Sequence, residues 1–252
     1  MTGYPLIEIC VEGIDGLIAA QQGGADRVEL CASLLEGGLT PSLGTVRAAL
    51  RVATVPFHVM VRPRGGDFLY SAEEFASMRD DVGIFRDAGV PGVVFGCLTV
   101  SGEVDQERTR ALVERAGPIA TVFHRAFDMT RDPASSLEAL IACGVGRVLT
   151  SGQRDRAEDG AALLRRLHGQ AAGRIAVLGC GGLRPETIAG VQAIARLDEL
   201  HFSAPMEAPS AMQWRNAALG MGGTAIDREY TRTLTDASLV ARTIAAVRGQ
   251  PA

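Results

Sequence analysis

Glutamate and cysteine recur at matching positions of two short apolar segments near the N-terminus. Ile7-Glu8-Ile9-Cys10 is echoed by Val28-Glu29-Leu30-Cys31. Because side chains alternate along a β-strand, the aliphatic residues should face one way, and the acids and thiols the other. Cys10 and Cys31 on neighbouring strands of matched register would lie close enough to share a soft ion such as Cu(I). The alternative is that both are small buried hydrophobes that fill space.

The two glutamates admit a chemical and a structural interpretation. Inward carboxylates at the end of a strand act as general acids, general bases or ligands of hard metals, so Glu8 and Glu29 are catalytic candidates. Equally, they fit a structural ion-pair network in which an inward arginine compensates their charge. His58, in the apolar segment Phe57–Arg62, is a further acid–base candidate, or a buried neutral histidine hydrogen-bonded to a glutamate.

Arginines and glycines follow that segment in Arg62-Pro63-Arg64-Gly65-Gly66-Asp67. Glycines let backbone N–H groups approach a ligand, and guanidinium groups supply charge, so Arg62 and Arg64 are candidates for binding an anion. The competing interpretation is a tight turn in which Asp67 neutralises one of the arginines.

A third polar group is His124-Arg125-Ala126-Phe127-Asp128, in which His124 and Asp128 suit acid–base chemistry and Arg125 suits an anion. Turns later in the chain could hold a phosphate or carboxylate on backbone N–H groups and hydroxyls, or could simply be turns. Their candidate residues are Ser151, Gly152, Gly181 and Ser203. A nucleophilic serine triad is disfavoured, since no serine lies in a Gly-x-Ser-x-Gly elbow.

Eight apolar segments, each followed by a segment of helical spacing, would position these residues. The expected strands are Leu6–Cys10, Arg27–Cys31, Phe57–Arg62, Gly92–Gly96, Ala120–His124, Arg147–Ser151, Ile175–Gly179 and Leu200–Ser203. The expected helices are Ile14–Gln22, Leu43–Arg51, Ala72–Asp87, Gln106–Ala116, Pro133–Cys143, Arg156–Gln170, Pro185–Arg196 and Asp236–Arg248.

Eight βα units over 252 residues predict a single-domain (β/α)8 barrel spanning residues 1–252. A doubly wound open sheet fits less well, because no strand leads into a Gly-x-Gly-x-x-Gly turn, and we expect no bound nucleotide. Chemistry then belongs at the carboxyl ends of the strands. The long segment Ala204–Thr235 should fold over one rim of the barrel.

Composition excludes several classes of function. The formal net charge is −4 and no basic cluster is dense enough for nucleic acid. No apolar stretch suits a signal peptide or a membrane span, and five cysteines without a Cys-x-x-Cys pair suggest free thiols in a reducing cytoplasm. The sequence contains no lysine, which excludes a Schiff base and with it pyridoxal phosphate chemistry.

Several collinear motifs resemble the CutC copper-homeostasis family almost from end to end. Besides the two Glu-x-Cys segments, they include Glu36-Gly37-Gly38-Leu39-Thr40-Pro41-Ser42, Arg62-Pro63-Arg64-Gly65-Gly66-Asp67-Phe68, Phe123-His124-Arg125-Ala126-Phe127-Asp128, Arg147-Val148-Leu149-Thr150-Ser151-Gly152 and Arg215-Asn216. The resemblance implies a cytoplasmic barrel, commonly a homo-oligomer, that binds copper through cysteine. By position, Cys10 and Cys31 are its ligand candidates. Where some relatives carry a second cysteine after the first, this chain has Val11.

Two hypotheses follow. In the first, the chain is a copper-binding protein that holds Cu(I) on Cys10 and Cys31. In the second, it is a barrel enzyme of the lyase, isomerase or hydrolase type, which acts on a small anionic or phosphorylated metabolite with the acids, histidines and arginines described above.

Overall fold

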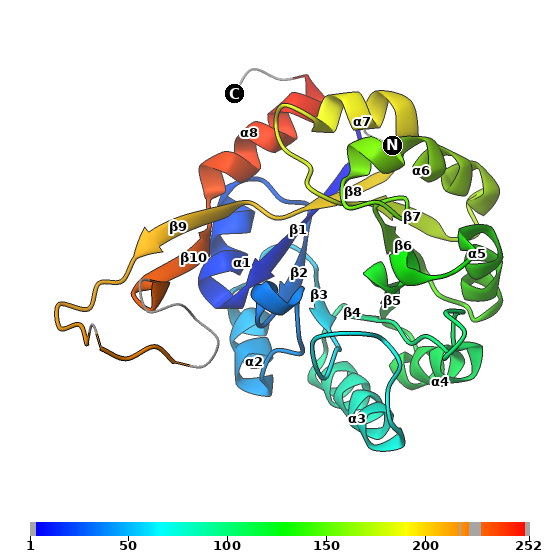
Figure 1. Ribbon diagram of the computed structural model, residues 1–252, viewed down its shortest axis with the longest axis horizontal. Coiled ribbons are helices and arrows are strands. Elements are labelled where there is room, and N and C mark those ends of the chain that lie inside the picture. The colour runs from blue at the N-terminus through cyan, green and yellow to red at the C-terminus, as the bar shows by residue number, and fades with distance from the viewer. Residues whose placement is uncertain (1–3, 217, 222–227, 250–252) are drawn as a thin grey trace.

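Eight parallel strands close into a barrel in chain order, and pairing of the first strand with the eighth completes the ring. The computed structural model describes residues 4–216, 218–221 and 228–249. Helices surround the barrel (Figure 1), as expected for a (β/α)8 fold. The strands are β1 Leu6–Glu12, β2 Arg27–Cys31, β3 Phe57–Met60, β4 Gly92–Phe95, β5 Ala120–Phe123, β6 Arg147–Thr150, β7 Ala176–Gly179 and β8 Glu199–Phe202.

The helices lie close to their predicted ranges. They are α1 Gly13–Gln22, α2 Leu43–Val52, α3 Ala72–Ala88, α4 Gln106–Ala116, α5 Pro133–Ala142, α6 Ala157–Ala171, α7 Ile188–Ala195 and α8 Ala237–Arg248, with short 3-10 helices η1 Leu34–Glu36 and η2 Arg125–Met129. Capping residues determine where several of the helices begin. Ser71 and Glu74 form a capping box at α3. The start of α7 was predicted too early, because Thr187 Oγ1 accepts a hydrogen bond from the Arg184 amide and forms a turn there.

Two apolar clusters lie on opposite sides of the barrel wall. Ile7, Ile9, Val28 and Leu30 pack outward with helix residues such as Leu17. A separate cluster inside the barrel contains Cys31, Met60, Val94, Val122, Leu149, Leu178 and Cys180, with Cys10 against it. The predicted alternation of the first two strands is therefore confirmed. Of their inward residues, Glu8, Glu29 and Cys31 are buried and Cys10 is half-buried.

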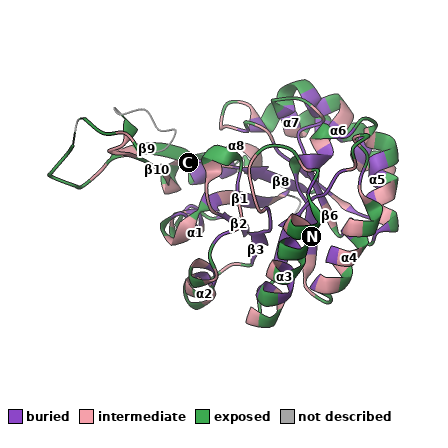
Figure 2. Ribbon diagram, turned by 60° about the horizontal axis from the view of Figure 1, so that its bottom comes forward, coloured by how far each residue is buried: buried purple, intermediate pink, exposed green. Residues whose placement is uncertain are grey.

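The segment after β8 does not cover the rim, so that prediction is wrong. Pro205–Pro209 (β9) and Thr231–Thr235 (β10) pair with each other as an antiparallel ribbon, from Pro205 opposite Thr235 to Pro209 opposite Thr231. The ribbon extends away from the side of the barrel (Figures 1 and 2), and β9 is mostly exposed. Its strands satisfy each other's backbone groups, so the segment needs no contact with the barrel mouth. Residues 217 and 222–227 of this segment lie outside the described residues.

Two glycines let the β6 loop approach the first turn of α6. Gly152 has φ +72°, and a Cβ on Gly160 would lie 1.9 Å from the Ser151 carbonyl oxygen, a backbone atom that cannot turn aside. This contact fixes the loop that carries Ser151 and Gly152.

We expect Gly160→Ala to lower the free energy of unfolding by about 1–3 kcal/mol, because helix and loop must separate to admit the methyl group. The matched control is Gly169→Ala in the same helix, where an added Cβ would meet nothing within 4 Å. There the loss of glycine's flexibility should stabilise the protein by about 0.5–1 kcal/mol. Urea unfolding of both variants tests these two predictions. Equal changes in the free energy of unfolding, with the same sign, would contradict them.

None of the helices in the described part of the chain is both long and apolar enough to cross a membrane.

Candidate functional site

A cavity of about 270 Å³ opens at the carboxyl ends of the strands. It lies where a (β/α)8 barrel places its chemistry. The predicted site residues that line it are Cys10, Glu29, Arg62, His124, Arg125, Gly181 and Ser203. Cys31 lies next to it, whereas Glu8, His58, Arg64, Asp128, Ser151 and Gly152 lie outside its lining.

Cys10 and Cys31 form a thiol pair with their sulfurs 3.9 Å apart. Cys10 is half-buried at the mouth, and Cys31 is buried. The strands are offset, so Cys10 is level with Glu29 while Cys31 is level with Glu12. The two inward side chains nevertheless meet. Ligand atoms of Cys10, Cys31 and Glu29 all lie within 4.8 Å of one another, close enough for one ion.

Both thiols hold their protons at neutral pH. The hydrogen bond with Cys31, together with burial and the nearby Glu29, raises the pKa of Cys10 well above its usual value. The pKa of Cys31 is raised to about 11. The hydrogen bond with Cys10 opposes that rise, but burial and the Glu29 carboxylate outweigh it. A metal ion must therefore displace these protons to bind.

Below the thiols, a chain of buried charges crosses the barrel interior. Arg27 Nε donates to Glu8 Oε2, and Arg27 Nη2 lies 2.6 Å from Glu199 Oε2. Arg147 Nε reaches the same Glu199 oxygen at 3.0 Å. Burial alone would raise the pKa of Glu8, but the hydrogen bond with His201, the nearby His58 and the Arg27 charge hold it well below its usual value. Glu8 is therefore an ionised structural carboxylate, in agreement with the structural alternative.

His201 connects this chain of charges to the mouth. Its Nδ1 lies 2.8 Å from Glu8 Oε1, and its Nε2 lies 3.8 Å from Glu29 Oε2. Burial would lower the pKa of His201, but the charge of Glu29 and bonds to Cys10 and Glu8 raise it well above its usual value. The sequence analysis placed no role on His201. The signal was present, because alternation along β8 turns His201 inward when Leu200 faces the helices.

His58 lies beside Glu8 rather than at the cavity. Its Nδ1 is 3.5 Å from Glu8 Oε2, which is an ion-pair distance without hydrogen-bond geometry, and the ring is buried. A Cβ on Gly92 would lie 2.4 Å from its Cδ2 atom, so the ring fills the space that this glycine leaves. This placement matches the structural alternative for His58.

Glu29 has one carboxylate oxygen free. Oε1 is buried and has no hydrogen-bond partner among the residues that the structure describes, while Oε2 accepts from Cys31 Sγ at 3.6 Å. Burial raises the pKa of Glu29. Its position between the thiol pair and the cavity allows either a metal contact or a contact with a bound molecule.

The two arginines of the predicted anion loop diverge. Arg62 is buried and lines the cavity. Arg64 instead binds Glu74 at 2.6 Å and Asp67 at 3.1 Å, and holds the loop against α3. For Arg64 the geometry therefore matches the tight-turn alternative.

Asp128 holds the β6 loop in place. Its carboxylate accepts from the amides of Ser151 and Gln153, each at 3.1 Å, and from the Ser151 hydroxyl at 2.9 Å. Arg125 Nε also donates to it at 2.8 Å. Gly152 donates to Thr150 Oγ1 at 3.0 Å. The Thr150 hydroxyl donates to Asp128 at 2.5 Å, so Gly152 is linked to Asp128 through Thr150. Of this group, only Arg125 lines the cavity.

His124 is buried at the cavity wall and caps η2. Its Nδ1 accepts from the Ala126 amide at 3.2 Å, which assigns the ring proton to Nε2. In the described part of the chain, Nε2 has no hydrogen-bond partner. Burial, together with the charge of Arg62, lowers the pKa of His124 to about 3.

The buried neutral ring predicts a pH effect on stability. An unfolded histidine takes a proton near pH 6.5, but folded His124 resists it until about pH 3, so its stabilising contribution is present above pH 6.5 and is lost as the pH falls. We expect His124→Asn to make the fall in unfolding free energy between pH 6.5 and 4 shallower, by up to about 1.4 kcal/mol per pH unit. Urea unfolding at several pH values measures this slope. Parallel curves for the variant and the wild-type protein would contradict the assignment.

Cys180 is a second feature that the sequence analysis did not assign. It is buried inside the barrel and lines the mouth cavity together with Cys10. Cys97 belongs to the cluster between barrel and helices, and Cys143 ends α5. All five cysteines are free thiols.

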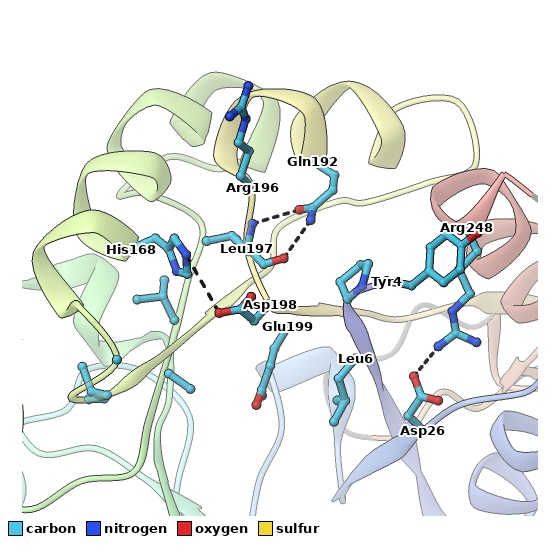
Figure 3. A pocket seen from close by; sticks show the side chains of 15 residues that line it. Tyr4, Leu6, Asp26, His168, Gln192, Arg196, Leu197, Asp198, Glu199 and Arg248 are labelled. Atoms are coloured by element: carbon cyan, nitrogen blue, oxygen red, sulfur yellow. Dashed lines mark hydrogen bonds and ion pairs between the residues drawn. The ribbon is translucent and has the colours of Figure 1, made fainter. Parts of the chain in front are cut away.

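A larger cavity, of about 880 Å³, lies at the opposite end, where the strands begin (Figure 3). Several of its polar side chains have partners within the described residues. Arg248 binds Asp26 at 2.5 Å, and His168 lies 3.9 Å from Asp198. Gln192 bonds both backbone groups of Leu197. This end of a (β/α)8 barrel serves stability, and the paired groups agree with that role.

Comparisons with known proteins give a consistent family. The family model described as "CutC family" matches residues 5–206. A protein named as CutC from Mesorhizobium japonicum is 65% identical over 247 residues, covering 98% of this chain and 96% of that protein. The human "Copper homeostasis protein cutC homolog" is 41% identical over 242 residues, covering 96% of this chain and 88% of that protein.

Solved structures agree. The crystal structure of a putative copper homeostasis protein CutC from Streptococcus agalactiae superposes with a TM-score of 0.75 at 29% identity, covering 79% of this chain and 98% of that chain. N-(5'-phosphoribosyl)anthranilate isomerase from Pyrococcus furiosus has a TM-score of 0.53 at 14% identity, covering 98% and 100% of the two chains, which shows the shared barrel fold. This chain therefore belongs to the CutC family.

Proposed function

We propose that the chain is a cytoplasmic copper-binding protein of copper homeostasis that holds Cu(I) between Cys10 and Cys31. The observation that carries the proposal is the 3.9 Å separation of the two sulfurs at the barrel mouth. Metal–thiolate bonds of about 2.3 Å, as in zinc sites, let two sulfurs at this separation reach one ion.

The donor set fits a soft ion. Thiolates select Cu(I) over hard ions, whereas carboxylates and water suit magnesium, calcium or manganese. Cys10 is half-buried, which gives an ion a way in, while Cys31 holds it away from water. His201, kept cationic by Glu8 and Glu29, lies close enough to Cys10 to balance the negative charge of a bis-thiolate complex.

An anaerobic Cu(I) titration against a chelator of known affinity tests this proposal. The wild-type protein should bind one Cu(I) per chain tightly, and the Cys10→Ser/Cys31→Ser variant should lose this binding. The Cys97→Ser/Cys143→Ser variant removes the same number of thiols away from the mouth and should retain it. Circular dichroism of each variant shows whether the fold is intact. Equal binding by both double variants would reject the thiol pair as the copper site.

The second candidate function is an enzyme that acts on a small anionic metabolite. It is favoured by Arg62, a cation that lines the cavity without a carboxylate partner among the described residues. Turnover of a metabolite by the purified protein, lost in the Glu29→Gln variant, would establish it. A metabolite screen without turnover would reject it.

A further inference from the structure

Arg62 is a buried cation whose charge nothing in the described chain neutralises. It is 6% exposed, and its guanidinium donates to the carbonyl oxygens of Glu36 at 2.5 Å, Gly38 at 3.2 Å and Gly66 at 2.9 Å. These carbonyl groups carry only partial charge, and the Arg62 Nε is buried without a hydrogen-bond partner among the described residues. A buried charge normally requires a full counter-charge, and Arg27, Arg64 and Arg125 each have one.

His124 lies in the same corner of the cavity. Phe68 joins the two residues, because the Arg62 guanidinium lies 5.1 Å from its ring centroid and the His124 ring lies 4.9 Å from it. His124 is 3% exposed, and its Nε2–H is a buried donor for which the described residues offer no acceptor. A buried donor left without an acceptor costs free energy. One anionic group would both accept from the His124 Nε2–H and neutralise the charge of Arg62.

The remaining walls supply further donors and apolar surface. The backbone amides of Gly181 and Gly182, which line the cavity, make no hydrogen bond within the described residues. Met60 and Leu149 supply apolar surface beside them. At about 270 Å³, the space lies just below the range of about 300–1,000 Å³ typical of drug-sized ligands, so it suits a molecule of few heavy atoms.

We propose that the mouth cavity binds a small organic monocarboxylate, whose carboxylate lies against Arg62 and the Nε2–H of His124 and whose apolar part lies on Phe68, Met60 and Leu149. Nothing in copper binding by the thiol pair requires this site. The inference names the ligand class for the second candidate function, but it concerns binding and stands whether or not the ligand is turned over.

The charge balance favours a carboxylate over a phosphate. Of the three arginines considered for the anion, Arg62 alone has no carboxylate partner within the described residues, since Arg125 is paired with Asp128 and Arg64 with Glu74. One buried positive charge is matched by one negative charge, whereas a phosphate dianion would leave a negative charge without a partner in a cavity that already contains Glu29. A guanidinium group also matches the planar geometry of a carboxylate.

The test is an NMR titration of the copper-free wild-type protein with propionate, followed through the backbone amide resonances. Propionamide serves as the neutral isostere, inorganic phosphate as the competing anion, and sodium chloride at equal ionic strength as the salt control. We expect saturable shifts at the cavity glycines with propionate only. No saturable shift with propionate, or tighter binding of phosphate, would overturn the inference.

Two variants locate the site. His124→Asn keeps a side-chain oxygen that can cap η2 but removes the Nε2–H, and Arg62→Gln removes the charge. Each should weaken propionate binding at least about tenfold. If loss of the loop contacts unfolds Arg62→Gln, His124→Asn alone decides. The Cys10→Ser/Cys31→Ser variant should bind propionate as the wild-type protein does. Unchanged binding in His124→Asn would overturn the inference, whether or not copper binding proves correct.

Discussion

Replacing Arg27 by methionine is expected to lower the free energy of unfolding by about 3–5 kcal/mol. Methionine has a comparable length but leaves the carboxylates of Glu8 and Glu199 buried without their main counter-charge. Removing one partner of a buried pair costs more than the pair contributes, because the remaining charge cannot reach water. Arg147 and His201 still contact Glu199 and Glu8, but they compensate the two carboxylates only in part. The free energy of unfolding of a typical domain is only about 5–15 kcal/mol. The variant should therefore unfold at a much lower urea concentration than the wild-type protein.

The control for this variant is Arg174→Met. Arg174 pairs with Glu138 at 2.8 Å, but both side chains are nearly half exposed, so the change should stay within about 1 kcal/mol. Adding Glu8→Gln to Arg27→Met removes one of the two carboxylates that have lost Arg27. The double variant should regain part of the lost free energy of unfolding. If Arg27→Met and Arg174→Met unfold alike in urea, the buried network does not stabilise the barrel as argued here.

Single replacement of either mouth thiol should weaken Cu(I) binding about 100-fold or more. Structural zinc sites gain about 10–16 kcal/mol from four ligands, which corresponds to about 3 kcal/mol for each thiolate. In a two-thiolate site, the loss of Cys10 or Cys31 leaves a single soft donor. Competition titration of Cys10→Ser and Cys31→Ser against the same chelator measures both losses.

Cys180→Ser is the sharpest control, because Cys180 is also buried inside the barrel and lines the same cavity. It does not belong to the group of ligand atoms within 4.8 Å that contains Cys10, Glu29 and Cys31. Its replacement should leave the Cu(I) affinity unchanged. An equal loss in Cys180→Ser would show a three-thiol site and contradict the two-thiolate geometry.

The barrel could be predicted because its signals are local. Apolar segments of four to six residues alternate with helical spacing, and capping residues such as Ser71 and Asp132 mark the helix starts. Alternation within β1 and β2 was enough to place Glu8, Cys10, Glu29 and Cys31 inside the barrel. The offset between the two strands was not predictable from the segments, because register depends on closure of the whole ring.

The details of the site depend on contacts between residues distant in sequence. Arg62 and Arg64 are two positions apart, yet one faces the cavity and the other binds Glu74, and only the path of the loop against α3 separates them. Arg27 joins Glu8 to Glu199, and Arg27 and Glu199 are 172 positions apart in the sequence. An inward arginine beside the glutamates was expected but not identified, although alternation along β2 places Arg27 on the same face as Glu29. The ribbon was missed because its two strands lie far apart in the chain.

The ribbon formed by β9 and β10 also affects how readily α8 packs against the barrel. Residues 203–236 separate β8 from α8, whereas 61–71 separate β3 from α3. Longer connections carry a larger loop-closure entropy, by about 1 kcal/mol for this difference. Pairing of Pro205 with Thr235, continued by the bond from the Asp236 amide to the Ala204 carbonyl at 2.8 Å, brings the two ends of the connection together. The ribbon thus offsets part of the entropy cost of the long connection before α8. Amide hydrogen exchange in α8 should accelerate when the pairing of β9 with β10 is weakened.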